Sequence, residues 1–166
     1  MADPTPTGER GKAKENLRNL LAESTAFQNA IGATGTLAEK IAAAKLRLHR
    51  TAYVPEEYPG FERPFGLLCS VGNDKSEKRG GFLLGGDIEL RLEKDIPAEY
   101  EANPENAEID FENFYEGVML DAMNLSGQPG YFAINSWDII EGPSQVEIDE
   151  AKFVSVIRIL INWGIS

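Results

Sequence analysis

Few residues of this chain could carry nucleophilic or metal chemistry. His49 is the single histidine and Cys69 the single cysteine among the 166 residues. A nucleophile activated by histidine needs a further group that orients the base, and a structural zinc ion takes four ligands. Cys69 lies in the apolar run LLCSV, which is typical of a small core side chain, and it has no partner for an internal disulfide. The sequence therefore predicts a protein that is not an enzyme and that holds no metal and no cofactor.

Carboxylates are the only catalytic side chains present in quantity. Two of them could form the acid pair of a glycosidase-type hydrolase, but no spacing singles out such a pair. The calcium loop of an EF-hand, the phosphate loop and the dinucleotide fingerprint each lack a required feature. Two alternatives stay open beside a structural role: a small-molecule or peptide-binding module and, with less support, a carboxylate-based hydrolase.

The acidic residues are concentrated in one part of the chain. The net charge is -11, and the segment 95–151 holds fourteen acids and no lysine or arginine, whereas residues 1–94 are nearly neutral. An acidic chain of this kind does not suit readout of nucleic-acid bases, which usually needs a basic face. The segment could serve solubility alone, or it could form an acidic surface with a task.

A strand of alternating character precedes the acidic segment. In GGDIELRLEKDIP, residues 85–97, three aliphatic side chains alternate with charged ones, and this period of two indicates a strand with one buried face. The charged face could be solvated surface, or it could meet a neighbouring molecule or line a passage.

The other elements follow from periodicity and from capping signals. We expect a first helix from Lys12 to Ile31, which Ser24 or Thr25 could divide by capping a new turn. Thr36 and Glu39 have the spacing of a capping box, so a short second helix should start at Leu37. The remaining expected elements are a strand over 46–51, a hairpin of 65–71 with 82–93, a helix over 111–124 capped by Asp110, and strands over 131–142 and 152–165.

This order, α-α-β-β-β-α-β-β, predicts an α+β fold with a mainly antiparallel sheet of about five strands and helices packed on it. Residues 1–11 are expected to form a disordered tail, and residues 12–166 a single α+β domain. The last strand is apolar on both faces and should lie centrally in the sheet. The residues expected to pack together are Phe111, Tyr115, Val118, Ile157, Ile159 and Ile161.

No segment of the sequence suggests a secretory or membrane protein. The first fifteen residues contain no apolar core of a signal peptide. The apolar run that starts at Phe153 is too short for a bilayer and is interrupted by Arg158 and Asn162. We therefore expect a soluble intracellular protein without a membrane partner.

With these elements in order, the chain resembles the tail terminator, or tail completion, proteins of long-tailed phages and prophages. The resemblance covers residues 12–166 and rests on four features: the helix LRNLLAESTAFQNAIG, the strand GGDIELRLEKDIP, the helix FENFYEGVMLDAMNLSG and the two closing strands. It implies a structural virion-assembly protein, present in the host cytoplasm during assembly and then in the virion. Such proteins form a ring, often a hexamer, that terminates the tail tube and joins it to the head connector.

The resemblance also implies partners and candidate surfaces. The implied partners are further copies of the chain, the tail-tube protein, the head-connector protein and DNA, which passes without base readout. Acidic walls would repel DNA phosphates and so suit a channel. Apart from the resemblance, the basic residues could touch phosphates or an acidic partner, or could be solvated surface: Arg10, Lys12, Lys14 and Arg18 near the start, and Lys75, Lys78 and Arg79. The candidate interface or channel residues are Asp87, Glu89, Arg91, Glu93, Lys75, Lys78, Arg79, Glu101, Glu105 and Glu108.

Overall fold

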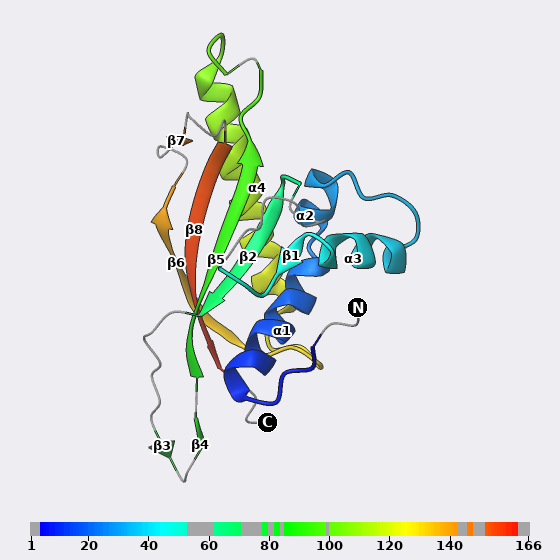
Figure 1. The fold of residues 1–166 in the computed structure, drawn as a ribbon, viewed down its shortest axis with the longest axis vertical. Coiled ribbons are helices and arrows are strands. Elements are labelled where there is room, and N and C mark those ends of the chain that lie inside the picture. The colour runs from blue at the N-terminus through cyan, green and yellow to red at the C-terminus, as the bar shows by residue number, and fades with distance from the viewer. Residues whose placement is uncertain are drawn as a thin grey trace.

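A computed structural model of the chain describes residues 4–52, 62–70, 78–79, 82–83, 85–98, 100–142, 146–147 and 152–162. These residues form an α+β fold, shown in Figure 1, with a sheet whose one face is covered by helices. The helices are α1 (Glu9–Ala22), α2 (Thr25–Ala30), α3 (Leu37–Lys45) and α4 (Pro104–Leu125). The strands are β1 (Leu48–His49), β2 (Phe65–Ser70), β3 (Lys78–Arg79), β4 (Phe82–Leu83), β5 (Gly85–Asp95), β6 (Ile134–Glu141), β7 (Val146–Glu147) and β8 (Lys152–Asn162).

The main sheet is mixed, with the strand order β1-β2-β5-β8-β6 and with β7 also paired to β8. The β2–β5, β5–β8 and β6–β8 pairs are antiparallel, but β1 runs parallel to β2. The expectation of a mainly antiparallel sheet is therefore corrected. Parallel neighbours need a connection of a dozen or more residues, and the segment between His49 and Phe65 is long enough to bring the chain back to the same end of the sheet.

The first helical segment is divided at Ser24, which is one of the two positions the sequence suggested. The Ser24 hydroxyl accepts a hydrogen bond from the Phe27 amide and so caps α2. The same hydroxyl donates to the Asp121 carboxylate at 2.8 Å, and Asp121 also accepts from the Ala26 amide at 3.0 Å. One acid of the acidic segment thus fastens α2 to α4. The capping box of Thr36 and Glu39 is also present at the start of α3.

The start of α4 differs from the expected one. The helix begins at Pro104 and not after Asp110, and it is 22 residues long. Proline suits the first turn of a helix because its missing N–H would have no intrahelical partner there, and Glu105 adds a negative charge near the positive end of the helix dipole. The segment before the helix therefore ends at Asn103, and Asp110 is an exposed residue inside the helix.

The core lies between α1, α2, α4 and the sheet. All six residues that were expected to pack together are buried and belong to one cluster: Phe111, Tyr115, Val118, Ile157, Ile159 and Ile161. The ring of Phe111 stacks on that of Phe153 with centroids 5.2 Å apart, which joins α4 to β8. Phe27 of α2 stacks on Phe114 of α4 at 6.3 Å. The central position expected for the last strand is confirmed, because β8 lies between β5 and β6.

Ser155 offers a first prediction about this core. It is fully buried in β8, and its hydroxyl has no hydrogen-bond partner among the described residues. A buried hydroxyl without a partner loses its hydration without compensation, so Ser155→Ala should raise the free energy of unfolding by about 1 kcal/mol. Chemical denaturation monitored by circular dichroism measures the change. Ser136→Ala, at an exposed position of β6, is the control and should stay within about 0.5 kcal/mol of the wild type. A loss of stability in Ser155→Ala would contradict the prediction.

Candidate functional site

Four charged residues of β5, Asp87, Glu89, Arg91 and Glu93, lie on the sheet face opposite the helical core. Ile88, Leu90 and Leu92 belong to the core cluster, so the residues between them point to the other face. In register, Glu93 lies between Phe65 and Val154, and Arg91 lies between Leu67 and Val156. Further along the same face, Glu89 lies between Cys69 of β2 and Arg158 of β8.

One end of this face is a buried ion-pair cluster. The Glu93 carboxylate lies 2.9 Å from Arg91 Nε and 3.1 Å from Lys152 Nζ, and only 4% of Glu93 is exposed. Lys152 is also buried. Glu93 and Arg91 were expected to belong to an interface or channel surface, but these distances give them partners within the chain. We call Arg91, Glu93 and Lys152 the Glu93 cluster.

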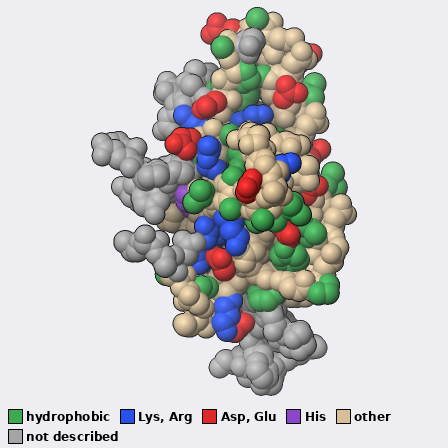
Figure 2. Space-filling model, turned by 90° about the vertical axis from the view of Figure 1, so that its right-hand side faces the viewer, with side chains coloured by type: hydrophobic (Ala, Val, Ile, Leu, Met, Phe, Trp, Pro, Cys, Tyr) green, Lys and Arg blue, Asp and Glu red, His purple; other side chains and the backbone are tan. Residues whose placement is uncertain are grey.

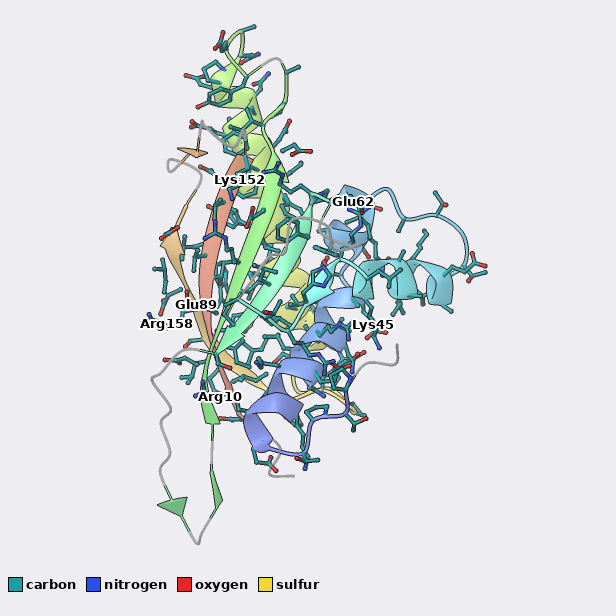
Figure 3. All side chains as sticks on the ribbon, in the orientation of Figure 1. Arg10, Lys45, Glu62, Glu89, Lys152 and Arg158 are labelled. Carbon is teal, nitrogen blue, oxygen red and sulfur yellow. The ribbon has the colours of Figure 1, made fainter. Side chains whose placement is uncertain are left out.

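The other end of the face is partly exposed. Asp87 and Glu89 are half-buried, and Glu89 lies opposite Arg158, whose own neighbour on the far side is Asp138 of β6. The Arg158 Nε is buried and has no hydrogen-bond partner. Figure 3 labels Glu89 and Arg158 close to β5 and β6. This end can therefore still take part in a contact with another molecule.

Cys69 and His49 lie near one another in the sheet topology. His49 is in register with Leu67 on the neighbouring strand, and Cys69 lies two residues further along that strand. Burial, followed by the charge of Glu89, raises the pKa of the Cys69 thiol, while Lys14 acts in the opposite direction. A raised pKa favours the protonated thiol, and a reactive cysteine needs the thiolate. The surroundings of Cys69 thus suit a packed thiol better than a nucleophile.

The acids near the start of α4 have different surroundings. Glu101 and Glu105 are exposed, in line with a surface role. Glu108 accepts a hydrogen bond from the Tyr100 hydroxyl at 3.1 Å, and this bond raises the pKa of Tyr100. Glu108 is therefore partly engaged within the chain.

The basic candidates are described only in part. Lys75 lies outside the described residues. Lys78 and Arg79 form β3, which pairs with β4 as a separate two-stranded sheet. Figure 1 draws this hairpin beyond the lower end of β5, apart from the helices. An isolated hairpin of such short strands has little stability of its own in water.

The outer face of α4 was missed as a candidate surface. Its large exposed apolar side chains are Ile109, Leu120 and Met123. The helix holds six acids and no lysine or arginine, and its acids are Glu105, Glu108, Asp110, Glu112, Glu116 and Asp121. The signal was available in the sequence, because these apolar residues fall outside the stripe of buried positions.

The side of the molecule that carries α3 brings basic residues together. In Figure 2, lysine and arginine side chains gather over the middle of this side. Arg18 is buried and donates from Nε to the Leu48 carbonyl at 2.9 Å and from NH2 to the Lys45 carbonyl at 3.0 Å, which ties α1 to the end of α3. Lys14 is half-buried nearby, and its pKa is lowered by burial and by the neighbouring Arg10 and Arg50.

Within the part of the chain that is described, no group of three or more histidine, cysteine or acidic side chains could hold a metal ion. Over the same residues, no helix is both long enough and apolar enough to cross a membrane.

Comparison of the chain with models of known protein families, with curated proteins and with solved structures gives no match in any of the three.

Proposed function

We propose that the chain is a structural virion-assembly protein of a long-tailed phage or prophage. In this role it is a tail terminator whose copies form a ring, a hexamer by the resemblance, that ends the tail tube and joins it to the head connector. The proposal is supported by the element order that carries the resemblance. A divided first helix, a strand pair ending in GGDIELRLEKDIP, a long helix and two closing strands occur in that order.

The observation that carries the proposal is the apolar surface that the described part of the chain leaves uncovered. Single exposed aliphatic side chains are normal on any protein, but here several occur in neighbouring pairs, which are typical of interaction surfaces. Leu120 and Met123 lie one turn apart on α4, and Ile139 and Ile140 are consecutive on β6. These side chains would be covered by other copies or by the tail-tube and head-connector proteins.

The acidic face of α4 supports a place beside the DNA path. Each cation that contacts a phosphate releases counterions and adds affinity, so a wall without lysine or arginine would let DNA pass without binding it. Glu101 and Glu105 are exposed and fit such a wall. We expect these glutamates to lie nearer the DNA path or a subunit contact than Lys75, Lys78 and Arg79 do in a reconstructed tail end. Glutamates that face only solvent at the outer rim would contradict this placement.

Salt dependence of assembly is the second prediction and tests the proposed ring. Each copy carries a net charge of -11, so copies repel one another at low ionic strength. The screening length is about 8 Å at 0.15 M salt and about 30 Å at 0.01 M. Added salt should therefore favour assembly, and the purified chain should form closed rings as its concentration and the salt are raised. Sedimentation velocity measures the species, and negative-stain electron microscopy shows their shape.

The opposite result has a clear meaning. A chain that stays monomeric at high salt and high concentration would contradict a ring formed by this protein alone. Such a monomer would favour the peptide-binding alternative, for which the open edge of β6 is the supporting observation, because an extended peptide can add a strand to a free sheet edge.

A further inference from the structure

The strand β6 forms an edge of the main sheet. Among the described strands, its one partner is β8, so the other side of β6 meets no strand. Sheet edges are commonly protected by lysine, by proline, by β-bulges or by a covering element. The sequence of β6, INSWDIIE, contains neither lysine nor proline. The pairing register between β6 and β8 shifts at two points along β6. These shifts shorten the regular part of the edge but do not cover it.

The exposed side chains of β6 combine apolar and acidic character. Ile139 and Ile140 are 40% and 43% exposed, and Ile140 lies at the second register shift, between Ile139 and Glu141. The two exposed isoleucines therefore lie together at the irregular part of the edge. The charged residues on either side are Asp138 and Glu141, and neither forms an ion pair within the described residues.

The opposite side of the sheet has the complementary character. There β1 is the last strand, and α3 lies beside it (Figure 1). Leu37 and Leu46, at the two ends of α3, are 65% and 68% exposed. Lys40 and Lys45 of α3 form no ion pair with any residue that the structure describes. Figure 3 labels Lys45 on this side and Arg158 on the β6 side, with the width of the sheet between them.

From these two edges we infer that copies of the chain join side by side, with the β6 edge of one copy against the α3–β1 edge of the next. The inference rests on the proposed function, since it names the contact that would build the ring. The two edges differ and lie on opposite sides of one sheet, so the contact is head-to-tail, and such contacts close into rings when the rotation between copies allows it. A contact between two β6 edges would instead stop at a dimer.

The charges of the two edges fit each other, although the copies repel overall. Asp138 and Glu141 of one copy would face the lysines of α3 in the next, while the isoleucines would meet Leu46. Charge pairs in direct contact are screened less than charges separated by a Debye length. Moderate salt therefore weakens the repulsion between whole copies more than it weakens this contact, which agrees with the salt dependence expected above.

A mixing experiment tests the head-to-tail contact. The acidic-edge variant is Asp138→Asn with Glu141→Lys, in which asparagine avoids a new cation opposite Arg158. The basic-edge variant is Lys40→Glu with Lys45→Glu. Each variant alone places like charges across every contact and should assemble at least tenfold more weakly than the wild type. An equimolar mixture should regain rings, because alternating copies place opposite charges at both kinds of contact. Mass photometry at a salt concentration where the wild type forms rings measures this.

Controls separate this inference from the proposed function and from misfolding. Circular dichroism and thermal unfolding of each variant should match the wild type. The double variant Ile139→Ser with Ile140→Ser leaves the charges of the edge unchanged and should also lose the rings.

Each remaining outcome counts against the inference. Rings in either edge variant alone, or no recovery on mixing, would overturn the edge contact while leaving the proposed ring in place. A loss of assembly in the acidic-edge variant but not in the basic-edge variant would indicate β6–β6 pairing. A wild-type chain that never assembles would overturn the contact and the proposed function together.

Discussion

Replacing Ile159 with alanine is expected to lower the free energy of unfolding by about 2–5 kcal/mol. Ile159 is fully buried in β8, where its neighbours in register are Ile88 on one side and Trp137 on the other. The substitution removes buried methyl groups and leaves a cavity in the middle of the sheet. The surrounding structure can close such a cavity only in part, because the neighbouring strand β5 is held by ladders to β2 and β8.

Urea denaturation followed by circular dichroism measures the loss under conditions where the chain is monomeric. Leu120→Ala is the matched control, since Leu120 is 62% exposed on α4 and alanine is a good helix former. We expect the control to change stability by less than about 1 kcal/mol. A loss below 1 kcal/mol for Ile159→Ala would show that β8 is not the central strand of the core.

The core was predictable because its signal is local and repeated. Both faces of β8 are apolar, which indicates a central strand, and the buried positions of α4 recur at helical spacing. The start of α4 was mispredicted because two capping signals compete there. Asp110 has a side chain suited to a cap, but Pro104 comes earlier, and the chain from Pro104 onward already places Ala107 in the same buried stripe as Phe111.

The candidate surfaces were less predictable, because strand neighbours are not visible in a local pattern. The alternation in β5 correctly separates a core face from a charged face, but it does not show that Lys152, far along the chain, lies beside Glu93. For the same reason, the parallel pairing of β1 with β2 could not be predicted from the local sequence pattern. The α3–β1 edge, which depends on that pairing, is seen only in the strand order of the sheet. Alternation thus predicts to which face of the sheet the charged side chains point. Whether those side chains are exposed depends on which residues of the neighbouring strands lie beside them.

The Glu93 cluster gives the second large expected effect. Glu93→Leu keeps a side chain of similar size but removes the carboxylate that lies 3.1 Å from Lys152 Nζ and 2.9 Å from Arg91 Nε. Arg91 is partly exposed and can turn toward water, whereas Lys152 is buried and loses the carboxylate beside it. Breaking a buried ion pair on one side costs about 3–5 kcal/mol, and we expect a loss of stability in this range.

The double variant Glu93→Leu with Lys152→Met separates a lost ion pair from a packing defect. Replacing both partners of a buried pair by apolar residues is often neutral or stabilising, so the double variant should recover most of the stability that Glu93→Leu loses. Glu89→Leu, on the same face of β5 but half-buried and without an ion pair among the described residues, is the control and should cost less than about 1 kcal/mol. Urea denaturation of the wild type, of Glu93→Leu, of Lys152→Met and of the double variant gives the coupling energy between Glu93 and Lys152. A double variant as unstable as Glu93→Leu, or a single variant as stable as the control, would show that Glu93 is not held by an internal ion pair. Its carboxylate would then be available to a neighbouring molecule, as the alternation of β5 first suggested.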